Sequence, residues 1–350
     1  MEELDPCTIE PDFTDDGREM WEHFRFVADK GQALLRVDKY LVERIPGTSR
    51  NRIQQAAEAQ CIIVNGRSVK SNYRVKPMDE VRVVMDRPRY ETEITPEDIP
   101  LDIAYEDEEV LVVNKPAGLV VHPGHGNYSG TLVNALAYYF RDNPDYDVND
   151  PRLGLVHRID KDTSGLIVIA KTPDAKTSLG RQFFEKTTKR QYIALVWGEM
   201  ENATGTITGN IGRNPKDRLQ MAVFDEGDQG KHAVTHYTTI ENLAHVALVR
   251  CQLETGRTHQ IRVHMKHIGH PLFNDARYGG DKVLRGYNTG TYMQFIHNCF
   301  ATCPRQALHA KTLGFRHPRT NVQMDFDSPV PDDMARLIEK WRAYAASGKK

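Results

Sequence analysis

The segment at residues 154–171 constrains the fold more than any other part of the chain. A dense polar stretch, His157 to Gly165, precedes a short, β-branched apolar run, Leu166–Ala170, of the kind that forms a buried strand. A loop held between core strands carries its side chains on a rigid support, which suits a catalytic carboxylate. Asp160 and Asp162 are the acids available for such a role. The alternative is a turn in which both acids only satisfy backbone groups.

Composition limits the classes of protein to consider. A chain of 350 residues is long enough for one large and one small domain, and 39% hydrophobic with 27% charged residues is typical of a soluble globular protein. No apolar stretch approaches the roughly 18–20 residues that a membrane span needs, and the acidic start lacks a signal peptide. Five scattered cysteines indicate reduced thiols in the cytoplasm. Cys299 and Cys303 lack the paired half-site of a zinc ribbon, so we expect no metal and buried thiols.

Charge is segregated along the chain. Residues 1–22 hold nine acids against one arginine, which predicts a disordered or loosely docked acidic tail. Residues 34–90 hold twelve Lys/Arg and six Asp/Glu, a net charge of +6, which favours a phosphate backbone as partner for a module at 23–90. Acidic, proline-bearing sequence follows, and residues 91–100 are expected to form a linker.

The basic module has a specific pattern. A helix is expected to begin at Leu35, with Leu34, Val37, Tyr40 and Leu41 on one face. Ser49 can cap a second helix from Arg50 to Ala59, whose first turn offers free backbone amides to a phosphate. Residues 61–67 and 81–84 are predicted strands, the first ending in a tight turn.

This pattern resembles the S4 RNA-binding domain, in which the second helix and the Val-Asn-Gly turn grip structured RNA. The resemblance implies RNA contacts from Arg36, Lys39, Ser49, Arg50, Arg52 and Asn65. The alternative is an ordinary solvated, charged face.

Residues 157–165 resemble the His-Arg-Leu-Asp-x-x-Thr-Ser-Gly signature of pseudouridine synthases of the large-subunit ribosomal RNA A/D type. Ile159 replaces the usual Leu, a volume-conserving difference. Further stretches resemble the family's other motifs in the same order, at residues 113–124, 189–198, 253–262, 271–280 and 308–310.

The resemblance implies that Asp160 is the catalytic carboxylate and that Arg257 pairs with it, since an opposite charge nearby favours the ionised form. Tyr192 is implied to stack near the flipped base and to remove the C5 proton, and Arg158 to fill the space that the base vacates. Lys115 is expected to support Tyr192 electrostatically. His157 and Thr163 are expected to support the loop, with His157, His259 and His264 hydrogen-bonded in the scaffold rather than acting as general acids.

Strand-like and helix-like runs do not alternate strictly, which predicts an α+β fold with a mixed or antiparallel sheet. The expected strands are 110–113, 166–170, 191–197, 234–240, 246–253 and 322–326, and the expected helices are 131–141, 173–186 and 258–267. By resemblance, the catalytic domain at 101–330 is built on an eight-stranded mixed sheet. A last helix, Met334 to Ala346, is expected within a C-terminal segment at 331–350.

The resemblance therefore implies a cytoplasmic enzyme that isomerises uridine to pseudouridine in a large-subunit ribosomal RNA stem-loop, without a cofactor. We expect a monomer that acts on ribosomal RNA, free or in pre-ribosomal particles, and not on membranes. Two alternatives stay open. One is a non-catalytic S4-type ribosome assembly factor, although Asp160, Tyr192 and Arg257 are all present. The other is a synthase for tRNA or small-subunit ribosomal RNA.

Overall fold

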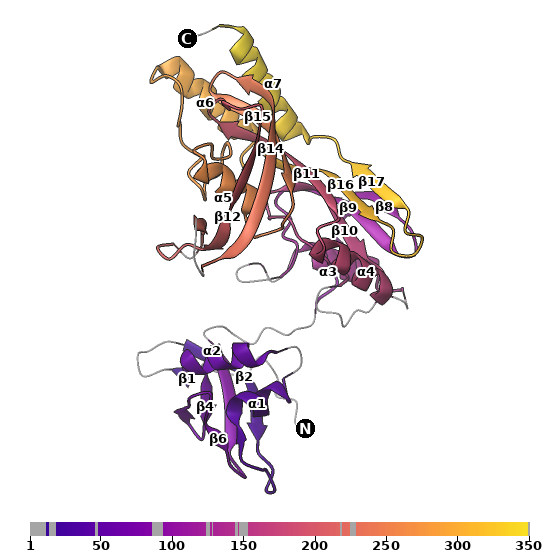
Figure 1. Cartoon of the computed structure of the whole chain (residues 1–350), viewed down its shortest axis with the longest axis vertical. Helices are drawn as coiled ribbons and strands as arrows, with labels where there is room; N and C mark the ends of the chain where they lie inside the picture. Colours follow the sequence, from indigo (N-terminus) through magenta and orange to yellow (C-terminus); the bar gives the residue numbers. More distant parts are fainter. Residues whose placement is uncertain are drawn as a thin grey trace. The chain divides into compact units, whose positions relative to one another are not determined.

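The computed structural model describes residues 12–13, 19–45, 48–85, 94–123, 127, 129–143, 146, 153–217, 219–224 and 229–348. The chain divides into two compact units, Met1–Glu93 and Ile94–Lys350 (Figure 1). The division falls inside the segment at 91–100 that the sequence analysis treats as a linker.

The N-terminal unit packs two helices, α1 (Val37–Val42) and α2 (Arg50–Glu58), beside small antiparallel sheets. The larger sheet has the order β1 (Asp12–Phe13), β2 (Glu19–Val27), β7 (Glu80–Met85), β4 (Ile62–Val64) and β5 (Arg67–Ser68), and β3 (Leu35–Arg36) pairs with β6 (Arg74–Val75). Apolar residues of both helices and of the strands share one core, centred on Val37, Leu41, Ile53, Ile62 and Val81.

Two boundaries in this unit differ from the sequence-based expectation. Strand β2 begins at Glu19, so the expected limit of an acidic tail at residue 22 lies inside a strand that pairs with β7. The first helix begins at Val37 rather than Leu35, and Leu34 is exposed instead of lying on the buried helix face. The reason is local pairing, since Leu35 and Arg36 are held in β3.

A buried carboxylate links the two helices of the N-terminal unit. Asp38 is fully buried and accepts hydrogen bonds from Arg36 at 3.0 Å, Arg50 at 3.0 Å and Gln54 at 3.1 Å. Although burial works to raise it, these hydrogen bonds lower the pKa of Asp38 to about 2. The carboxylate therefore fixes α2 against α1 while it is ionised.

The C-terminal unit is built on a ten-stranded mixed sheet, two strands more than the resemblance implies. Its order is β13 (Met221–Phe224), β12 (Thr204–Arg213), β14 (Lys231–Leu243), β15 (Val246–Leu253), β11 (Lys189–Trp197), β16 (Leu308–Arg316), β10 (Ser164–Ala170), β9 (Val110–Lys115) and β8 (Ile103–Glu106), and β17 (Gln323–Asp327) also pairs with β16. Strands β10 and β16 are parallel, and the other pairings between the described strands are antiparallel. The predicted α+β class with a mixed sheet is confirmed.

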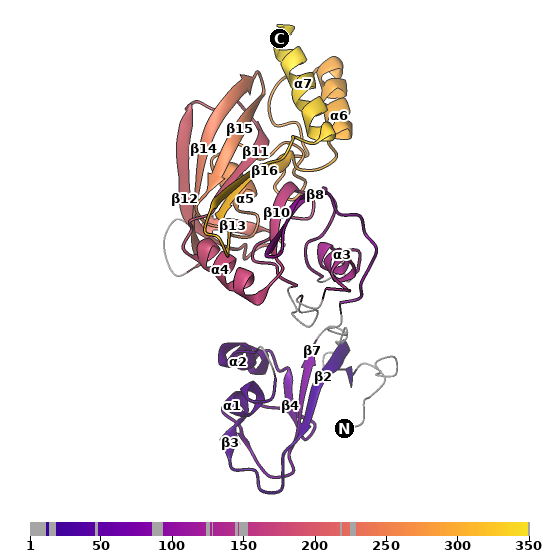
Figure 2. The ribbon, with the colours of Figure 1, turned by 90° about the vertical axis from the view of Figure 1, so that its right-hand side faces the viewer.

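Helices cover both faces of this sheet. On one face, α3 (Leu132–Tyr139) and α5 (Gln260–His267) contribute to the core that contains Tyr192, Ala194 and Cys251. On the other, α4 (Pro173–Phe184) packs near β10, while α6 (Gly290–Thr302) and α7 (Asp332–Ala346) lie side by side (Figure 2). Because Trp341 of α7 is fully buried in that second core, the segment at 331–350 belongs to the C-terminal unit rather than forming a separate part.

The predicted strands and helices of this unit are present, with shifted ends. Five elements have no counterpart in the sequence prediction, namely β8, β12, β13, β16 and α6. Strand β12 reads Thr-Gly-Thr-Ile-Thr-Gly-Asn-Ile-Gly-Arg, which has few apolar side chains. It is a strand because both neighbours satisfy its backbone, which is a tertiary effect. No helix within the described ranges is long and apolar enough to cross a membrane.

Asp38→Asn should lower the free energy of unfolding of the N-terminal unit by about 1–3 kcal/mol at pH 7, because Asn replaces a charged acceptor of hydrogen bonds from three side chains. A carboxylate whose pKa is depressed to about 2 stabilises the fold above its ordinary pKa of 3.8, and that contribution is lost as the pH falls towards 2. The gap between wild type and variant should therefore close between about pH 5 and pH 2. Hydrogen exchange of residues 37–64 with mass spectrometry measures this difference in stability. A difference that is unchanged at pH 2 would contradict the stabilising role of the ionised Asp38.

Candidate active site

The loop that carries Asp160 is anchored by the strand that follows it. Gly165, in β10, has a φ of +114°, and a Cβ there would collide with the backbone carbonyl of Ala310 in β16. Because β10 and β16 run in parallel through Ser164 and Gly165, the sheet sets the position of the preceding loop. The Thr-Ser-Gly end of the motif is thus needed for close packing of two strands.

Lys115, at the end of β9, holds the loop from inside the protein. It is fully buried, and its ammonium donates to the carbonyls of Pro116 at 2.7 Å, Leu119 at 2.8 Å and Lys161 at 2.8 Å. Burial lowers the pKa of Lys115 to about 7, against the effect of Asp162 and Asp160. The structure therefore gives Lys115 a role in shaping the loop, and the expected support of Tyr192 has no contact behind it.

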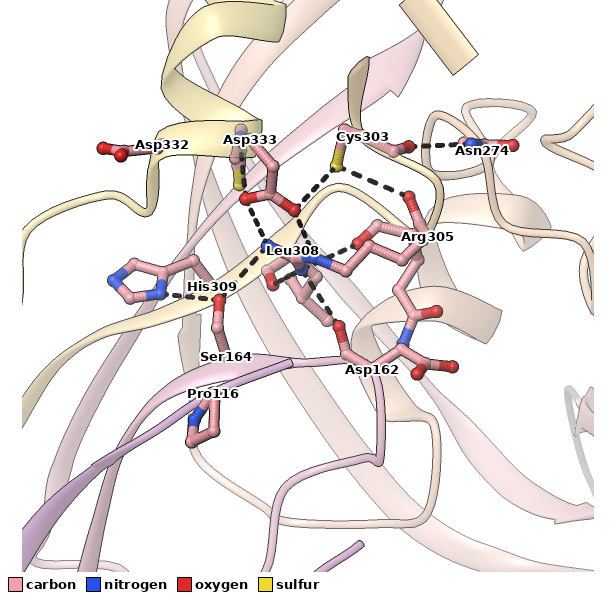
Figure 3. A network of polar contacts seen from close by, with 12 residues as sticks. Pro116, Asp162, Ser164, Asn274, Cys303, Arg305, Leu308, His309, Asp332 and Asp333 are labelled. Atoms are coloured by element: carbon pink, nitrogen blue, oxygen red, sulfur yellow. Dashed lines mark hydrogen bonds and ion pairs between the residues drawn. The ribbon is translucent and has the colours of Figure 1, made fainter. Parts of the chain in front are cut away.

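Arg305 holds the other side of the loop (Figure 3). Its guanidinium donates to the carbonyls of Asp162 at 2.9 Å and Leu308 at 3.1 Å, and to Ser164 Oγ at 3.4 Å. Asp333, at the start of α7, binds the same guanidinium through both carboxylate oxygens, at 2.7 and 3.0 Å. The C-terminal helix thereby orients an arginine that fixes the backbone two residues after Asp160.

Asp160 itself forms an ion pair with Arg262. The guanidinium Nη1 of Arg262 lies 2.9 Å from Asp160 Oδ2, while Nε and Nη2 bind Asp275 at 2.7 and 2.9 Å. Arg262 is 6% exposed and Asp275 is 1% exposed. Burial works to lower the pKa of Arg262, but Asp275 and Asp160 raise it, so the guanidinium stays charged. The buried Asp275 fixes the plane of the arginine, and the remaining edge orients Asp160.

The expected pair between Arg257 and Asp160 is wrong, because Arg262 holds that place. Arg257 Nε donates instead to the carbonyl of His232 at 3.1 Å. The helix α5 begins at Gln260, which puts Arg262 in its first turn. One feature of the sequence could have pointed to Arg262 as the partner of Asp160. This arginine lies between Ile261 and Val263, within a predicted helix that has an apolar face.

Asp160 opens into a pocket that also contains Tyr192. Among the described residues that line this pocket, Asp160 is the single acid, and the other ionisable groups include Arg158, Arg190 and Arg257. Tyr192 is 7% exposed, and burial raises the pKa of its hydroxyl. A carboxylate, a neutral phenol and several guanidiniums thus face one space.

The supporting residues of the motif lie close by. Thr163 is buried, and its N–H donates to the Asp160 carbonyl at 3.1 Å, which closes the turn. His157 Nε2 accepts from the Val168 N–H at 3.0 Å, and its ring stacks on Phe183. Arg158 is exposed at the pocket rim. These contacts agree with a supporting role for His157 and Thr163.

Three histidines near the site are hydrogen-bonded within the scaffold, as the sequence analysis expects. Burial lowers the pKa of His157 to about 3 and those of His259 and His264 to about 4. His259 contacts Tyr278 Oη at 2.9 Å, and His264 contacts Thr235 Oγ1 at 2.9 Å. At neutral pH these imidazoles are uncharged and do not supply a proton as imidazolium.

The residues expected to bind RNA in the N-terminal unit separate into two groups. Lys39 and Arg52 are exposed, and Ser49 caps α2 by accepting the Arg52 N–H at 3.4 Å. Arg36 and Arg50 are half exposed and already bound to Asp38.

Asn65 also has partners inside the N-terminal unit. Its amide donates to Asp79 at 2.8 Å and accepts the Glu80 N–H at 2.9 Å. Asn65 therefore shapes its turn. Of the residues expected to contact RNA, Lys39 and Arg52 are the charged ones that form no ion pair with a described residue.

Cys299 and Cys303 are buried, and burial raises the pKa of each thiol to about 12. Cys303 Sγ lies 3.6 Å from Asp333. Within the described residues, no group of three or more His, Cys, Asp or Glu side chains is arranged to hold a metal ion.

Comparison with known proteins assigns both units. A family model described as RNA pseudouridylate synthase matches residues 109–267, and one described as S4 domain matches residues 35–81. A protein of Chlorobaculum parvum named as an RNA pseudouridine synthase is 45% identical over 322 residues, covering 91% of this chain and 98% of the relative. The protein of Xylella fastidiosa named ribosomal large subunit pseudouridine synthase D is 44% identical, with coverage of 90% and 92%.

The same-named protein of Escherichia coli O6:H1 is 44% identical, covering 88% of this chain and 91% of the relative. Among solved structures, human RNA pseudouridylate synthase domain containing 4 superposes with a TM-score of 0.51 at 22% identity, covering 69% of this chain and 92% of that one, which supports the fold. Since relatives match over nearly their whole length, this chain belongs to the RNA pseudouridine synthase family and carries an S4 domain N-terminal to its synthase domain.

Proposed function

We propose that this synthase converts uridine to pseudouridine in a stem-loop of large-subunit ribosomal RNA, with Asp160 as the catalytic carboxylate and no cofactor. The choice of target is supported by the relatives named ribosomal large subunit pseudouridine synthase D, which match at 44% identity. A ribosomal target is also the basis for the cytoplasmic location that the sequence predicts.

The observation that carries the proposal is the placement of Asp160. It is the one acid among the described residues that line its pocket, and Arg262 holds one of its oxygens at 2.9 Å. That contact fixes the position of one carboxylate oxygen and sets the orientation of the whole group. A carboxylate so oriented can attack C1′ of the ribose, or act as a base at the ribose. Both routes stay open.

The reaction needs few further groups. Breaking the N1–C1′ bond and joining C5 to C1′ gains and loses no atoms, since N1 takes up a proton and C5 releases one. Tyr192 is within the same pocket and is our candidate for removing the C5 proton, its ring also serving as a stacking surface. The uridine must leave its helix stack to enter the pocket, and Arg158 at the rim is placed to occupy the vacated space.

The alternative of a non-catalytic assembly factor is disfavoured because Asp160, Arg262 and Tyr192 form an intact site. Targets in tRNA or small-subunit ribosomal RNA are separated from the proposed one by pseudouridine mapping of total RNA from cells with and without this gene. Loss of a modification in the large-subunit RNA supports the proposal, and loss in tRNA or the small subunit alone refutes the target.

Asp160→Asn should reduce tritium release from 5-tritiated uridine in large-subunit RNA to background, because an amide neither ionises nor attacks C1′. Asp162→Asn is the matched control, since Arg305 binds the carbonyl of Asp162 and an Asn conserves that contact. The control should stay within about tenfold of the wild-type rate. Comparable rates for both variants would remove Asp160 from the mechanism.

Arg262→Lys should lower kcat by about 10²-fold or more with little change in KM, because an ammonium cannot bind both oxygens of Asp275 in the plane of a guanidinium and still orient Asp160. Arg257→Lys should act mainly on KM, since the Arg257 guanidinium faces the pocket without contacting Asp160. Single-turnover kinetics separate the two effects. The reverse assignment, with kcat lost in the Arg257 variant alone, would restore the pairing expected from the sequence.

Replacing Lys39 and Arg52 together by Gln should weaken RNA binding and reduce the slope of log K against log salt by roughly 1.5–2, because two phosphate contacts are lost. Lys30→Gln with Lys76→Gln removes the same charge from exposed sites after β2 and β6 and should change the slope less. Filter binding at several salt concentrations measures both. Equal slopes for the two double variants would show that α1 and α2 do not form the RNA contact.

A further inference from the structure

Arg190 is a buried arginine without a carboxylate partner. It lies on β11 two residues before Tyr192, so both side chains project from the same face of the sheet. Arg190 is 6% exposed, its Nε is buried without a hydrogen-bond partner, and no acid within the described residues forms an ion pair with it. Burial lowers the pKa of its guanidinium.

Other buried arginines of the same unit are paired. Arg262 contacts Asp160 and Asp275, and Arg305 contacts Asp333. An unpaired buried charge is costly to a fold, by several kcal/mol, because its hydration is lost without compensation. Arg190 has instead the ring of Phe183, 5.4 Å from its guanidinium, which offsets little of that cost.

Arg190 lies in the wall between two pockets. One pocket contains Asp160 and Tyr192, and the other is lined by His122, His157 and Phe183, among others. The residues that line both are Arg158, Arg190, Gly256 and Arg257. Three arginines thus lie at the boundary between the catalytic pocket and its neighbour.

Gly256 makes room for this arrangement. A Cβ at this position would lie 2.9 Å from Nη1 of Arg190, closer than real Cβ contacts allow. Glycine therefore permits the guanidinium to lie against the backbone of the loop that carries Arg257. The boundary between the two pockets is therefore formed around the guanidinium of Arg190.

We infer that Arg190, with Arg257 beside it, binds a backbone phosphodiester of the RNA adjoining the target uridine, so that the uracil enters the catalytic pocket and the neighbouring nucleotide lies over the second. The inference rests on the proposed function for the identity of the RNA. Guanidinium groups bind phosphate oxygens through two parallel hydrogen bonds, and an RNA linkage is the anion that must pass this point when a uridine reaches Asp160. Arg190 is thus a substrate-binding residue whose negative partner is the phosphate of the bound RNA.

Stability and affinity should move separately in Arg190→Met. Removing an unpaired buried charge should leave the Tm unchanged or raised, while the affinity for unmodified large-subunit RNA falls about tenfold and the salt slope decreases by about 1. Arg190→Lys should retain part of the affinity. Arg250→Met is the matched control, because Arg250 is exposed and pairs in register with Ile193, on the opposite face of the sheet from Tyr192. A lower Tm with unchanged affinity and salt slope would make Arg190 a structural residue and overturn the inference.

A second measurement does not depend on how stable the variant is. Stem-loop RNA with one neutral methylphosphonate on the 5′ or the 3′ side of the modified uridine is compared with phosphodiester RNA of the same sugar chemistry. Wild-type enzyme should bind one of the two neutral RNAs about tenfold more weakly, and Arg190→Met should not distinguish that RNA from its phosphodiester control. Equal binding of all RNAs by the wild type overturns the inference. Pseudouridine formation by the wild type in the phosphodiester RNA tests the proposed function separately.

Discussion

The position of Asp160, the proposed catalytic carboxylate, depends on one buried guanidinium. Arg262 uses two of its nitrogens on Asp275 and the third on Asp160. The two-nitrogen contact with Asp275 fixes the plane of the guanidinium, and the remaining nitrogen can then hold Asp160 in one orientation. The charge on Arg262 also offsets the cost of two acids close together in a partly closed site. The rest of the synthase unit can be understood as the frame that brings α5, the loop of Asp160 and the loop of Asp275 to this point.

That frame holds the loop through its backbone. Lys115 binds the carbonyl of Lys161, and Arg305 binds that of Asp162, so two basic side chains fix consecutive peptide groups just after Asp160. Backbone contacts of this kind place a loop without competing for the Asp160 side chain. Because Asp333 of α7 orients Arg305, the C-terminal helix supports the candidate active site although it is distant in sequence.

The arginines of the two units fall into two groups, those with a carboxylate partner and those without one. Arg36, Arg50, Arg262 and Arg305 are bound to carboxylates and stabilise local structure. Arg158, Arg190 and Arg257 line the pocket without such partners among the described residues, and Lys39 and Arg52 are exposed on the S4 domain. Net charge alone does not distinguish these groups, since a paired guanidinium contributes little to attraction of a phosphate backbone.

The sequence by itself determined the two-unit organisation, the α+β class and most of the strands and helices, because these follow from local patterns. Asp160 and Tyr192 were assigned to one site by the resemblance of their motifs to those of a known family. The sequence did not determine which arginine pairs with Asp160: Arg257 and Arg262 lie five residues apart, and the start of α5 between them turns them to different partners. It also missed β12 and β16, whose residues become strands through pairing with distant neighbours. The unpaired state of Arg190 is likewise a tertiary property, since the acids that neutralise a buried arginine come from elsewhere in the chain, and whether any reaches it is decided only when the sheet and loops are assembled.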